Sequence, residues 1–238
     1  MRFAICLSNF GTYADPHAAV RVALAAEAAG WDGFFMWDHL AFVWGPQSAD
    51  PWVTLAAIAS ATEQLTLGTA VTPLPRRRPQ VVAQQVGTLD RLNGGPVVLG
   101  AGLGGNEKEF TAFGEDFDPH RRAKLLDDGL ELVRKLWQGP IWIGGNSAPA
   151  LRRASRWDGW IANSVIPDWS GLPAMKTRTT TAATMAICHH TLTWLSIATR
   201  LIPATLSARH IAIRTPMVTS APDRIGTSPL AMITVVLP

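Results

Sequence analysis

The stretch from Gly139 to Arg153, GPIWIGGNSAPALRR, joins a short apolar run to two glycines and then to a helical pattern. Gly144 and Gly145 permit positive φ and let a ligand approach the main chain closely. A helix that begins at Asn146 or Ser147 would present free backbone N–H groups, which suit an anion such as a phosphate. A tight strand-to-helix turn without a ligand fits the same residues, so the local sequence leaves both interpretations open.

A second glycine-rich stretch, residues 100–105 (GAGLGG), matches the G-x-G-x-x-G pattern of dinucleotide-binding loops and follows the apolar run 97–99. A Rossmann fold also requires a helix that opens at the third glycine and a second strand that ends in an acid. Glu115, Asp116 and Asp118 do follow, but the intervening NEKEFTAFG contains no β-branched strand run. An NAD-dependent Rossmann enzyme is therefore the less favoured alternative.

Strand and helix patterns alternate through the first two thirds of the chain. Three helices begin at Asp-Pro pairs, at Asp15, Asp50 and Asp118, where aspartate can cap free N–H groups and proline suits the first helical position. The strand-like runs are residues 3–7, 33–37, 65–71, 97–101, 141–143 and 159–162. This alternation predicts a parallel sheet covered by helices. Either a (β/α) barrel or an open doubly wound sheet fits the pattern.

Composition limits the class of protein. The chain has 238 residues, of which 47% are hydrophobic and 16% charged, enough for one sizeable core. The formal net charge is +3, and no basic stripe with interleaved aromatics is present, so we do not expect a nucleic-acid partner. Arg76, Arg77 and Arg78 form the longest basic run, and we expect them in a solvated loop.

The two cysteines, Cys6 and Cys188, lie far apart in the sequence and have no metal-type spacing. A disulfide framework is not expected, and a reducing cytoplasm is the default location. Cys188, His189 and His190 supply too few ligands for a metal site, so none is expected. The N-terminus lacks a signal-peptide pattern, and no segment approaches the roughly 18 apolar residues of a membrane span.

Five segments occur in order along the chain: AAEAAGWDGFFMWDHL, LTLGTAVTPLPRRRP, LDRLNGGPVVLGAGLGGNEKEFTAFG, LDDGLELVRKLWQG and IWIGGNSAPALRRASRWDGW. Together they resemble the bacterial-luciferase-like oxidoreductases, which use FMN or the deazaflavin coenzyme F420. The resemblance covers roughly residues 1–175. It implies an α/β fold of the (β/α)8 TIM-barrel type, incomplete here because six βα units are recognisable. Sites in such barrels lie at the C-terminal ends of the strands.

The resemblance also implies where a cofactor would bind. The loop after the fifth strand receives the cofactor phosphate in the family, and a bulge with a cis peptide near the third strand lies against the ring. The implied cofactor-binding residues are Ala70, Val71, Gly102, Gly144, Gly145, Asn146 and Ser147.

A histidine often follows the second strand in this family, facing the reactive edge of the cofactor. His39, after Asp38, occupies that place and is the expected catalytic residue, since an imidazole can move a proton near neutral pH. A histidine bonded to a neighbouring loop is the alternative. Asn9, Phe10 and Trp44 are the expected substrate-pocket residues, although Trp44 could equally pack a long loop.

One departure from the family concerns acid-base chemistry. Some deazaflavin-dependent members place a glutamate directly after the G-x-G of the fourth strand. Here Leu103 and Gly104 hold that place, and the first acid is Glu107. We expect Glu107 on a solvated face rather than in the site.

The last part of the chain differs in composition. Residues 176–238 contain 13 threonines but only one acid, Asp223, and one glycine, Gly226. We therefore divide the chain into a barrel portion, 1–175, and an anomalous tail, 176–238, that is read from a shifted frame or is otherwise foreign to the barrel. Family-like sequence in another reading frame of the gene would support this. The alternative is a divergent end that supplies the seventh and eighth strands, with residues 232–237 in one of them.

The sequence thus predicts a flavin- or deazaflavin-dependent oxidoreductase of the luciferase-like monooxygenase class, acting on a small organic substrate. A non-catalytic family remnant with weak or no cofactor binding is the second hypothesis. Neither a membrane nor a nucleic-acid partner is expected, and a homodimer is compatible with the resemblance.

Overall fold

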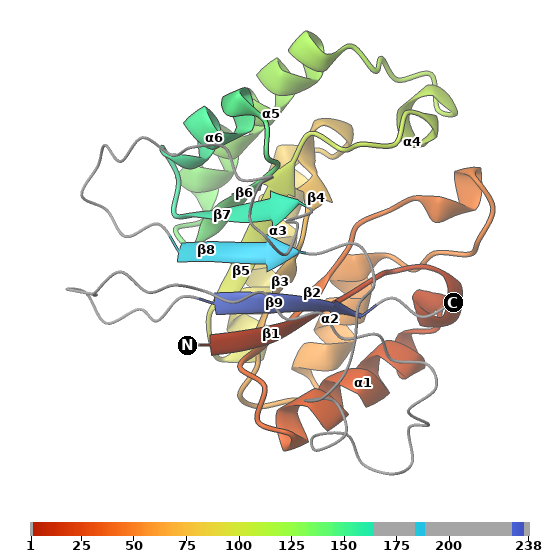
Figure 1. Ribbon diagram of the computed structural model, residues 1–238, viewed down its shortest axis with the longest axis vertical. Coiled ribbons are helices and arrows are strands. Elements are labelled where there is room, and N and C mark those ends of the chain that lie inside the picture. Colours follow the sequence, from red (N-terminus) through yellow and green to blue (C-terminus); the bar gives the residue numbers. More distant parts are fainter. Residues whose placement is uncertain (1, 164–183, 189–229, 236–238) are drawn as a thin grey trace, which may run out of the picture.

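A computed structural model of the protein describes residues 2–163, 184–188 and 230–235. They form one parallel sheet with helices on its outer face (Figure 1). The strands are β1 (Arg2–Leu7), β2 (Gly33–Met36), β3 (Thr66–Thr69), β4 (Thr72–Pro73), β5 (Val97–Gly102), β6 (Ile141–Gly144), β7 (Gly159–Asn163), β8 (Thr184–Cys188) and β9 (Leu230–Val235). The helices are α1 (Pro16–Ala28), α2 (Pro51–Ala59), α3 (Pro79–Asn93), α4 (Lys108–Thr111), α5 (Pro119–Leu136) and α6 (Ala148–Ala154), with short 3-10 turns η1 (Gly11–Ala14), η2 (Ala41–Val43) and η3 (Leu74–Arg76).

The sheet curls instead of spreading. Its strand order is β8-β7-β6-β5-β3-β2-β1-β9, with β4 paired to β5, and every pairing is parallel. The two strands at the ends of this order, β8 and β9, lie side by side (Figure 1). The fold is therefore an α/β barrel of the (β/α) type, as predicted. It is incomplete, because within the described ranges no helix follows β7.

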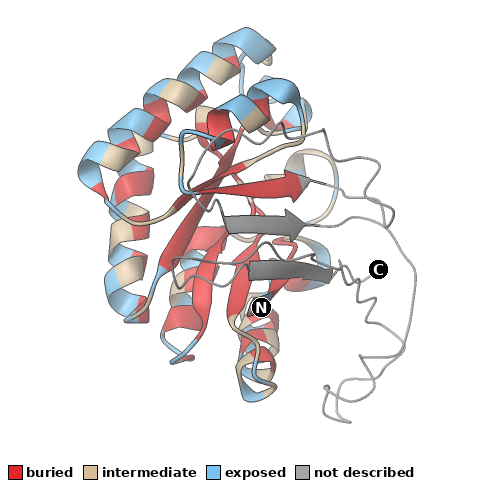
Figure 2. Ribbon diagram, turned by 60° about the vertical axis from the view of Figure 1, so that its left-hand side comes forward, coloured by how far each residue is buried: buried red, intermediate tan, exposed pale blue. Residues whose placement is uncertain are grey.

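The core has two layers because successive strand residues point to opposite faces. The outer face packs under the helices and includes Leu7, Phe34 and Leu99. The inner face fills the barrel, where the rings of Phe35 and Trp142 stack with centroids 5.9 Å apart. Figure 2 shows the buried strands inside a shell of helices whose outer surfaces are exposed.

The predicted helix starts are confirmed. Asp15, Asp50 and Asp118 each cap a helix through a side-chain oxygen that accepts a backbone N–H, and proline holds the first position in all three. Of the two predicted starts for the helix after residue 145, Asn146 and Ser147, it is Ser147 that caps α6. The caps fix where each helix leaves its loop, and hence where the loops at the C-terminal ends of the strands lie.

The third predicted strand, 65–71, is interrupted. β3 ends at Thr69, the peptide bond between Ala70 and Val71 is cis, and β4 then pairs with β5. This is the position at which the resemblance implied a cis peptide.

Two strands come from the tail. β8 pairs with β7, and β9 pairs with β1 from Arg2 opposite Leu230 to Leu7 opposite Val235. The alternative in which the tail supplies two strands thus agrees with the structure in part, with β9 beginning two residues before the predicted segment. His189 and His190 lie outside the described residues, as does most of the tail. The proposed frame shift and the boundary at residue 175 stay predictions.

Candidate active site

A cavity of about 380 Å³ opens at the C-terminal ends of β2, β3, β5 and β6. This lies within the range of roughly 300–1,000 Å³ that small-molecule pockets occupy. Its lining is Trp37, Asp38, His39, Ala70, Val71, Pro73, Gly102, Leu103, Gly104, Gly105, Glu109, Gly144, Gly145, Ser147, Ala150, Arg153 and Ile161. Seven of the predicted site residues are in this lining, contributed by four separate strand-to-helix connections.

One end of the cavity is formed by the predicted phosphate loop. Gly145 has φ of 122°, a conformation that L side chains rarely adopt, and its carbonyl accepts a hydrogen bond of 2.7 Å from Trp160 Nε1. Ser147 Oγ accepts from Ala150 N at 3.3 Å and so caps α6, while its O–H can still donate a hydrogen bond to a ligand. Asn146 belongs to the same loop but does not line the cavity.

The middle of the cavity has a floor that allows very close backbone approach. Val71 lies between Gly102 and Gly144, and a Cβ atom built on either glycine would lie 2.7 Å from a methyl group of Val71. At Gly100 a Cβ would lie 1.9 Å from the Thr69 carbonyl oxygen. Packing therefore requires glycine at these three positions, two of which, Gly102 and Gly144, line the cavity.

The other end holds a histidine–carboxylate pair. His39 Nδ1 lies 2.6 Å from Glu109 Oε1, and Trp44 Nε1 donates to the same oxygen at 3.1 Å. The Glu109 side chain is 2% exposed, whereas that of His39 is 32% exposed. An ionised carboxylate can only accept, so Nδ1 carries the hydrogen. The other ring nitrogen, Nε2, has no hydrogen-bond partner among the described residues and is the one available to a ligand.

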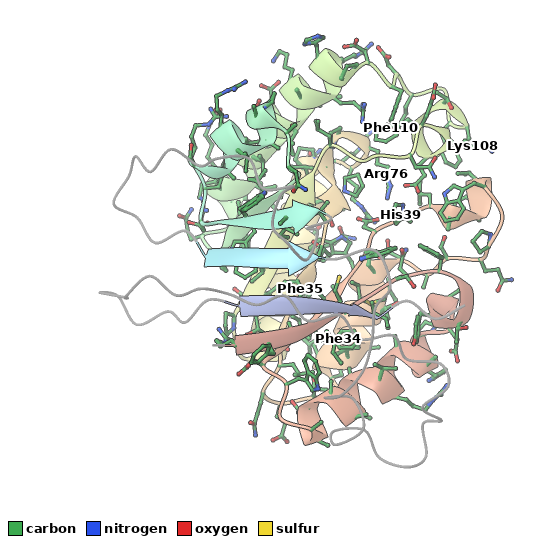
Figure 3. All side chains as sticks on the ribbon, in the orientation of Figure 1. Phe34, Phe35, His39, Arg76, Lys108 and Phe110 are labelled. Atoms are coloured by element: carbon green, nitrogen blue, oxygen red, sulfur yellow. The ribbon has the colours of Figure 1, made fainter. Side chains whose placement is uncertain are left out.

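A buried ion-pair network stands behind this pair. Arg76 donates to Glu109 Oε2 at 3.3 Å, to Asp38 Oδ1 at 2.9 Å and to the Asp38 carbonyl. Arg77 forms an ion pair with Asp38 at 2.8 Å and reaches Asp50 at 3.3 Å. In Figure 3, Arg76 and His39 lie at the same end of the barrel, with α4 beyond them. The network joins the loop after β2, the turn η3 and helix α4.

The surroundings of Glu109 favour its charged form. Burial by itself raises the pKa of this carboxyl group, but the hydrogen bond and charge of His39, the Trp44 N–H and the charge of Arg76 together hold the pKa below its ordinary value. Arg77 is also kept charged. Burial by itself lowers the pKa of its guanidinium, but the charges and hydrogen bonds of Asp38 and Asp50 more than offset this and raise the pKa.

The three predicted substrate-pocket residues surround His39 without lining the cavity. Asn9 is fully buried, and its amide binds the backbone of His39 and Ala49 at 2.7–3.0 Å. The Phe10 ring packs edge-on against Trp44 and His39, with centroids 5.2 and 5.8 Å apart. These contacts make Asn9, Phe10 and Trp44 supports of the histidine loop.

Three residues at or behind the site, Glu109, Arg76 and Arg77, were missed by sequence reasoning. Glu107 is exposed, as expected, but Glu109 two positions later is buried. Glu107 is the N-cap residue before α4 and Glu109 lies within the helix, and side chains two residues apart point in very different directions. The expectation of a solvated arginine run was wrong for Arg76 and Arg77, whose side chains are 3% and 17% exposed, because buried carboxylates pair with them. Arg78 is exposed.

The lining fits a planar, phosphate-bearing cofactor. Gly102 and Gly144 beside Val71, a glycine loop with positive φ and a histidine line one cavity. The long helix and second strand that a Rossmann site requires after GAGLGG are absent from the described residues 103–118, where α4 is only four residues long. Among the described residues, no group of three His, Cys, Asp or Glu side chains could hold a metal ion.

The sequence of this chain matches the luciferase-like monooxygenase family over residues 1–184. The chain belongs to this family. An uncharacterized protein of Mycobacterium tuberculosis is 30% identical to it over 213 residues, which cover 71% of each chain. An F420-dependent hydroxymycolic acid dehydrogenase of the same organism is 33% identical over 172 residues, which cover 60% of this chain and 48% of the dehydrogenase. This chain therefore spans about half the length of that family member.

Solved structures of luciferase-like enzymes share the fold. An F420-dependent secondary alcohol dehydrogenase, in complex with an F420–acetone adduct, superimposes with a TM-score of 0.65 at 20% identity, covering 78% of this chain and 68% of the enzyme. The FMN-bound oxygenating constituent of the 3,6-diketocamphane monooxygenase of Pseudomonas putida gives 0.62 at 15% identity, covering 79% and 66%. The relatives in sequence thus include an F420-dependent enzyme, and a structure with the same fold holds FMN. In the described ranges, none of the helices has the length and apolar character needed to cross a bilayer.

Proposed function

We propose that this protein is an F420- or FMN-dependent oxidoreductase that oxidises a small organic alcohol, or runs the reverse reaction, by hydride transfer. The observation that carries the proposal is the pairing of His39 with the buried carboxylate of Glu109 at one end of a glycine-floored cavity. F420 is the better supported cofactor, because the dehydrogenase relative at 33% identity uses it.

Three parts of the cavity have separate roles in this proposal. Gly144, Gly145 and Ser147 hold the cofactor phosphate, and the floor beside Val71 supports the ring. Asn146 is proposed to act from the same loop. A bound flavin or deazaflavin supplies the hydride acceptor.

His39 handles the proton. As the substrate carbon gives up a hydride, the hydroxyl proton passes to Nε2 of His39, and the carbon–oxygen single bond becomes a carbonyl. The ionised Glu109 accepts a hydrogen bond from Nδ1–H and stabilises the imidazolium that forms. This arrangement presents the unprotonated Nε2 to the substrate, which a general base requires.

A second candidate is a family member without catalysis that binds the cofactor weakly or not at all. It is favoured by the composition of residues 176–238, which contain 13 threonines but only one acid and one glycine. The two candidates differ in turnover, so one set of measurements separates them.

The experiment is a fluorescence titration of the purified protein with F420 and, separately, with FMN, followed by single-turnover reduction of the bound cofactor by a panel of secondary alcohols. Saturable binding and alcohol-dependent reduction are expected. Glu109→Gln should slow reduction by about 100-fold while leaving cofactor affinity within about twofold. Glu107→Gln, at the exposed N-cap residue of α4, is the matched control and should behave as the parent.

Binding without reduction by any alcohol would favour the non-catalytic candidate. A folded sample that binds neither cofactor would contradict both the phosphate-loop and the ring-floor assignments. If Glu109→Gln and Glu107→Gln change the rate of cofactor reduction equally, the role proposed for the histidine–carboxylate pair is contradicted.

A further inference from the structure

Arg76 is the residue in which the buried charges of the site converge. Its side chain is 3% exposed, and its guanidinium contacts two carboxylates whose side chains are 1% and 2% exposed, those of Asp38 and Glu109. These acids are 71 residues apart in sequence; Asp38 lies in the loop after β2 and Glu109 in helix α4. A guanidinium can bind two acceptors at once because its N–H groups are arranged in a planar fork.

The contacts divide the Glu109 carboxylate into two sides. Oε2 faces Arg76, and Oε1 accepts from His39 and Trp44. Rotation of the carboxylate away from His39 would therefore break the bond to Arg76 as well. The same guanidinium holds the Asp38 carbonyl, which immediately precedes His39 in the chain. Both members of the pair are thus fixed to one cation.

We propose that Arg76 is a positioning residue for His39 and Glu109: it holds the ionised carboxylate against Nδ1 and so fixes which nitrogen of His39 faces the cavity. Its importance for turnover rests on the function proposed above, whereas its effect on the pair does not. Arg76 does not line the cavity, so it acts through its neighbours.

Arg77 is a natural control. It lies next to Arg76, is also largely buried, and forms an ion pair with the same Asp38, but it bonds to Asp50 rather than Glu109. A general loss of loop packing would follow from removal of either arginine. Only removal of Arg76 takes the cation away from Glu109. The groups that face Glu109 are His39 and Trp44, from the loop after β2, and Arg76, from η3. Asp38 lies beyond Arg76, and Lys108 of α4 is exposed.

The test compares Arg76→Met, Arg76→Lys and Arg77→Met with the parent, after circular dichroism has established folding. In the free protein, a hydrogen-bonded Nδ1 proton of His39 gives a downfield resonance, assigned by its loss in His39→Asn. We expect this resonance to vanish in Arg76→Met, to weaken in Arg76→Lys and to persist in Arg77→Met. Lysine keeps the charge but lacks the fork that joins both acids.

Kinetics supply the second measurement. Arg76→Met should lower kcat by about 10- to 100-fold with little change in cofactor affinity. Without Arg76 the pKa of Glu109 rises, so the acid limb of the pH–rate profile should move to higher pH in Arg76→Met, stay in place in Arg77→Met and lie between them in Arg76→Lys.

The resonance tests the role of Arg76, and the kinetics also test the proposed function, so the two proposals can be contradicted separately. A parent-like resonance in both Arg76 variants, or an equal loss in Arg77→Met, would overturn the proposal. If Arg76→Met does not fold, comparison of the resonance in Arg76→Lys with that in Arg77→Met tests the same proposal. If the parent shows no turnover with any cofactor, the proposed function fails while the resonance still decides the role of Arg76.

Discussion

At the scale of single residues, the site depends on a carboxylate kept charged where water hardly reaches it. Glu109 is buried, and ionising a buried acid is unfavourable unless donors and cations surround it. Here one imidazole, one indole N–H and one guanidinium do so. The charge in turn determines the tautomer of His39, so a residue that no local pattern singled out decides what the expected catalytic histidine presents to the cavity.

This arrangement makes stability depend on pH. The pKa of Glu109 is lower in the folded state than in the unfolded chain, where it is near 4.3, so its contribution is present above that value and is lost as pH falls through the folded pKa. We expect the difference in unfolding free energy between the parent and Glu109→Gln to shrink from pH 7 to pH 3. Urea unfolding across this range measures it, with Glu107→Gln as the control. A difference that stays constant with pH would contradict the ionised assignment.

The phosphate loop gives a second prediction at this scale. Gly145→Val is expected to weaken cofactor binding at least tenfold, because a branched side chain blocks backbone approach and is strained at φ of 122°. Gly30→Val is the control: it has φ of 79° with open space around it, and it follows α1 away from the cavity. Both variants should lose stability, but only Gly145→Val should lose affinity in the titration. Unchanged affinity in Gly145→Val would exclude this loop from the binding site.

At the scale of elements, helix caps and site loops are connected. Asp50 caps α2 through Oδ1, which accepts from Trp52 N and Val53 N at 2.9 and 3.0 Å, while Oδ2 pairs with Arg77. The start of α2 is thus tied to the charge network behind His39. The cap of α1 is simpler, since Asp15 Oδ1 accepts only from His17 N.

We expect Asp50→Ala to lower the free energy of unfolding by about 1–2 kcal/mol, because two helix N–H groups lose their acceptor. Asp50→Asn keeps an acceptor and loses the charge, so it should cost less than the alanine variant. Chemical denaturation of the three proteins checks the order, and Asp15→Ala provides a cap away from the network. If Asp50→Ala lowers the free energy of unfolding no more than Asp50→Asn does, the cap contributes little here.

At the scale of the whole molecule, the curled sheet depends on a strand far from the rest in sequence. β9 pairs with β1 through six residue pairs, so β1 is an internal strand of the sheet. An unpaired edge presents free N–H and C=O groups that attract other chains. The end of the chain therefore protects its beginning.

Deletion of residues 230–238 is expected to expose β1 and to produce aggregation, measured as loss of soluble protein and of its monodisperse peak in size-exclusion chromatography. Deletion of residues 236–238 alone leaves β9 in place and is the control, which should remain soluble. Equal solubility of the two proteins would show that the β1–β9 pairing does not protect the sheet.

The sequence by itself determined what depends on neighbours along the chain. The Asp-Pro starts, the apolar runs and the glycine loop at residues 144–147 follow from caps, periodicity and backbone freedom, which act within a few residues. They were sufficient for a parallel α/β fold, for the position of His39 after a strand, and for a helix start at Asn146 or Ser147. Resemblance, not periodicity, selected the barrel.

Only the tertiary structure decided what depends on partners distant in sequence. Glu109 rather than Glu107 faces His39 because α4 presents one side to the barrel and the other to solvent, and Arg76 and Arg77 are buried because Asp38 and Glu109 meet them there. The pairing of β9 with β1 is of the same kind. Burial, ionisation and strand pairing depend on the residues that surround a group in the folded protein, and here those surroundings place a loop histidine against a buried carboxylate.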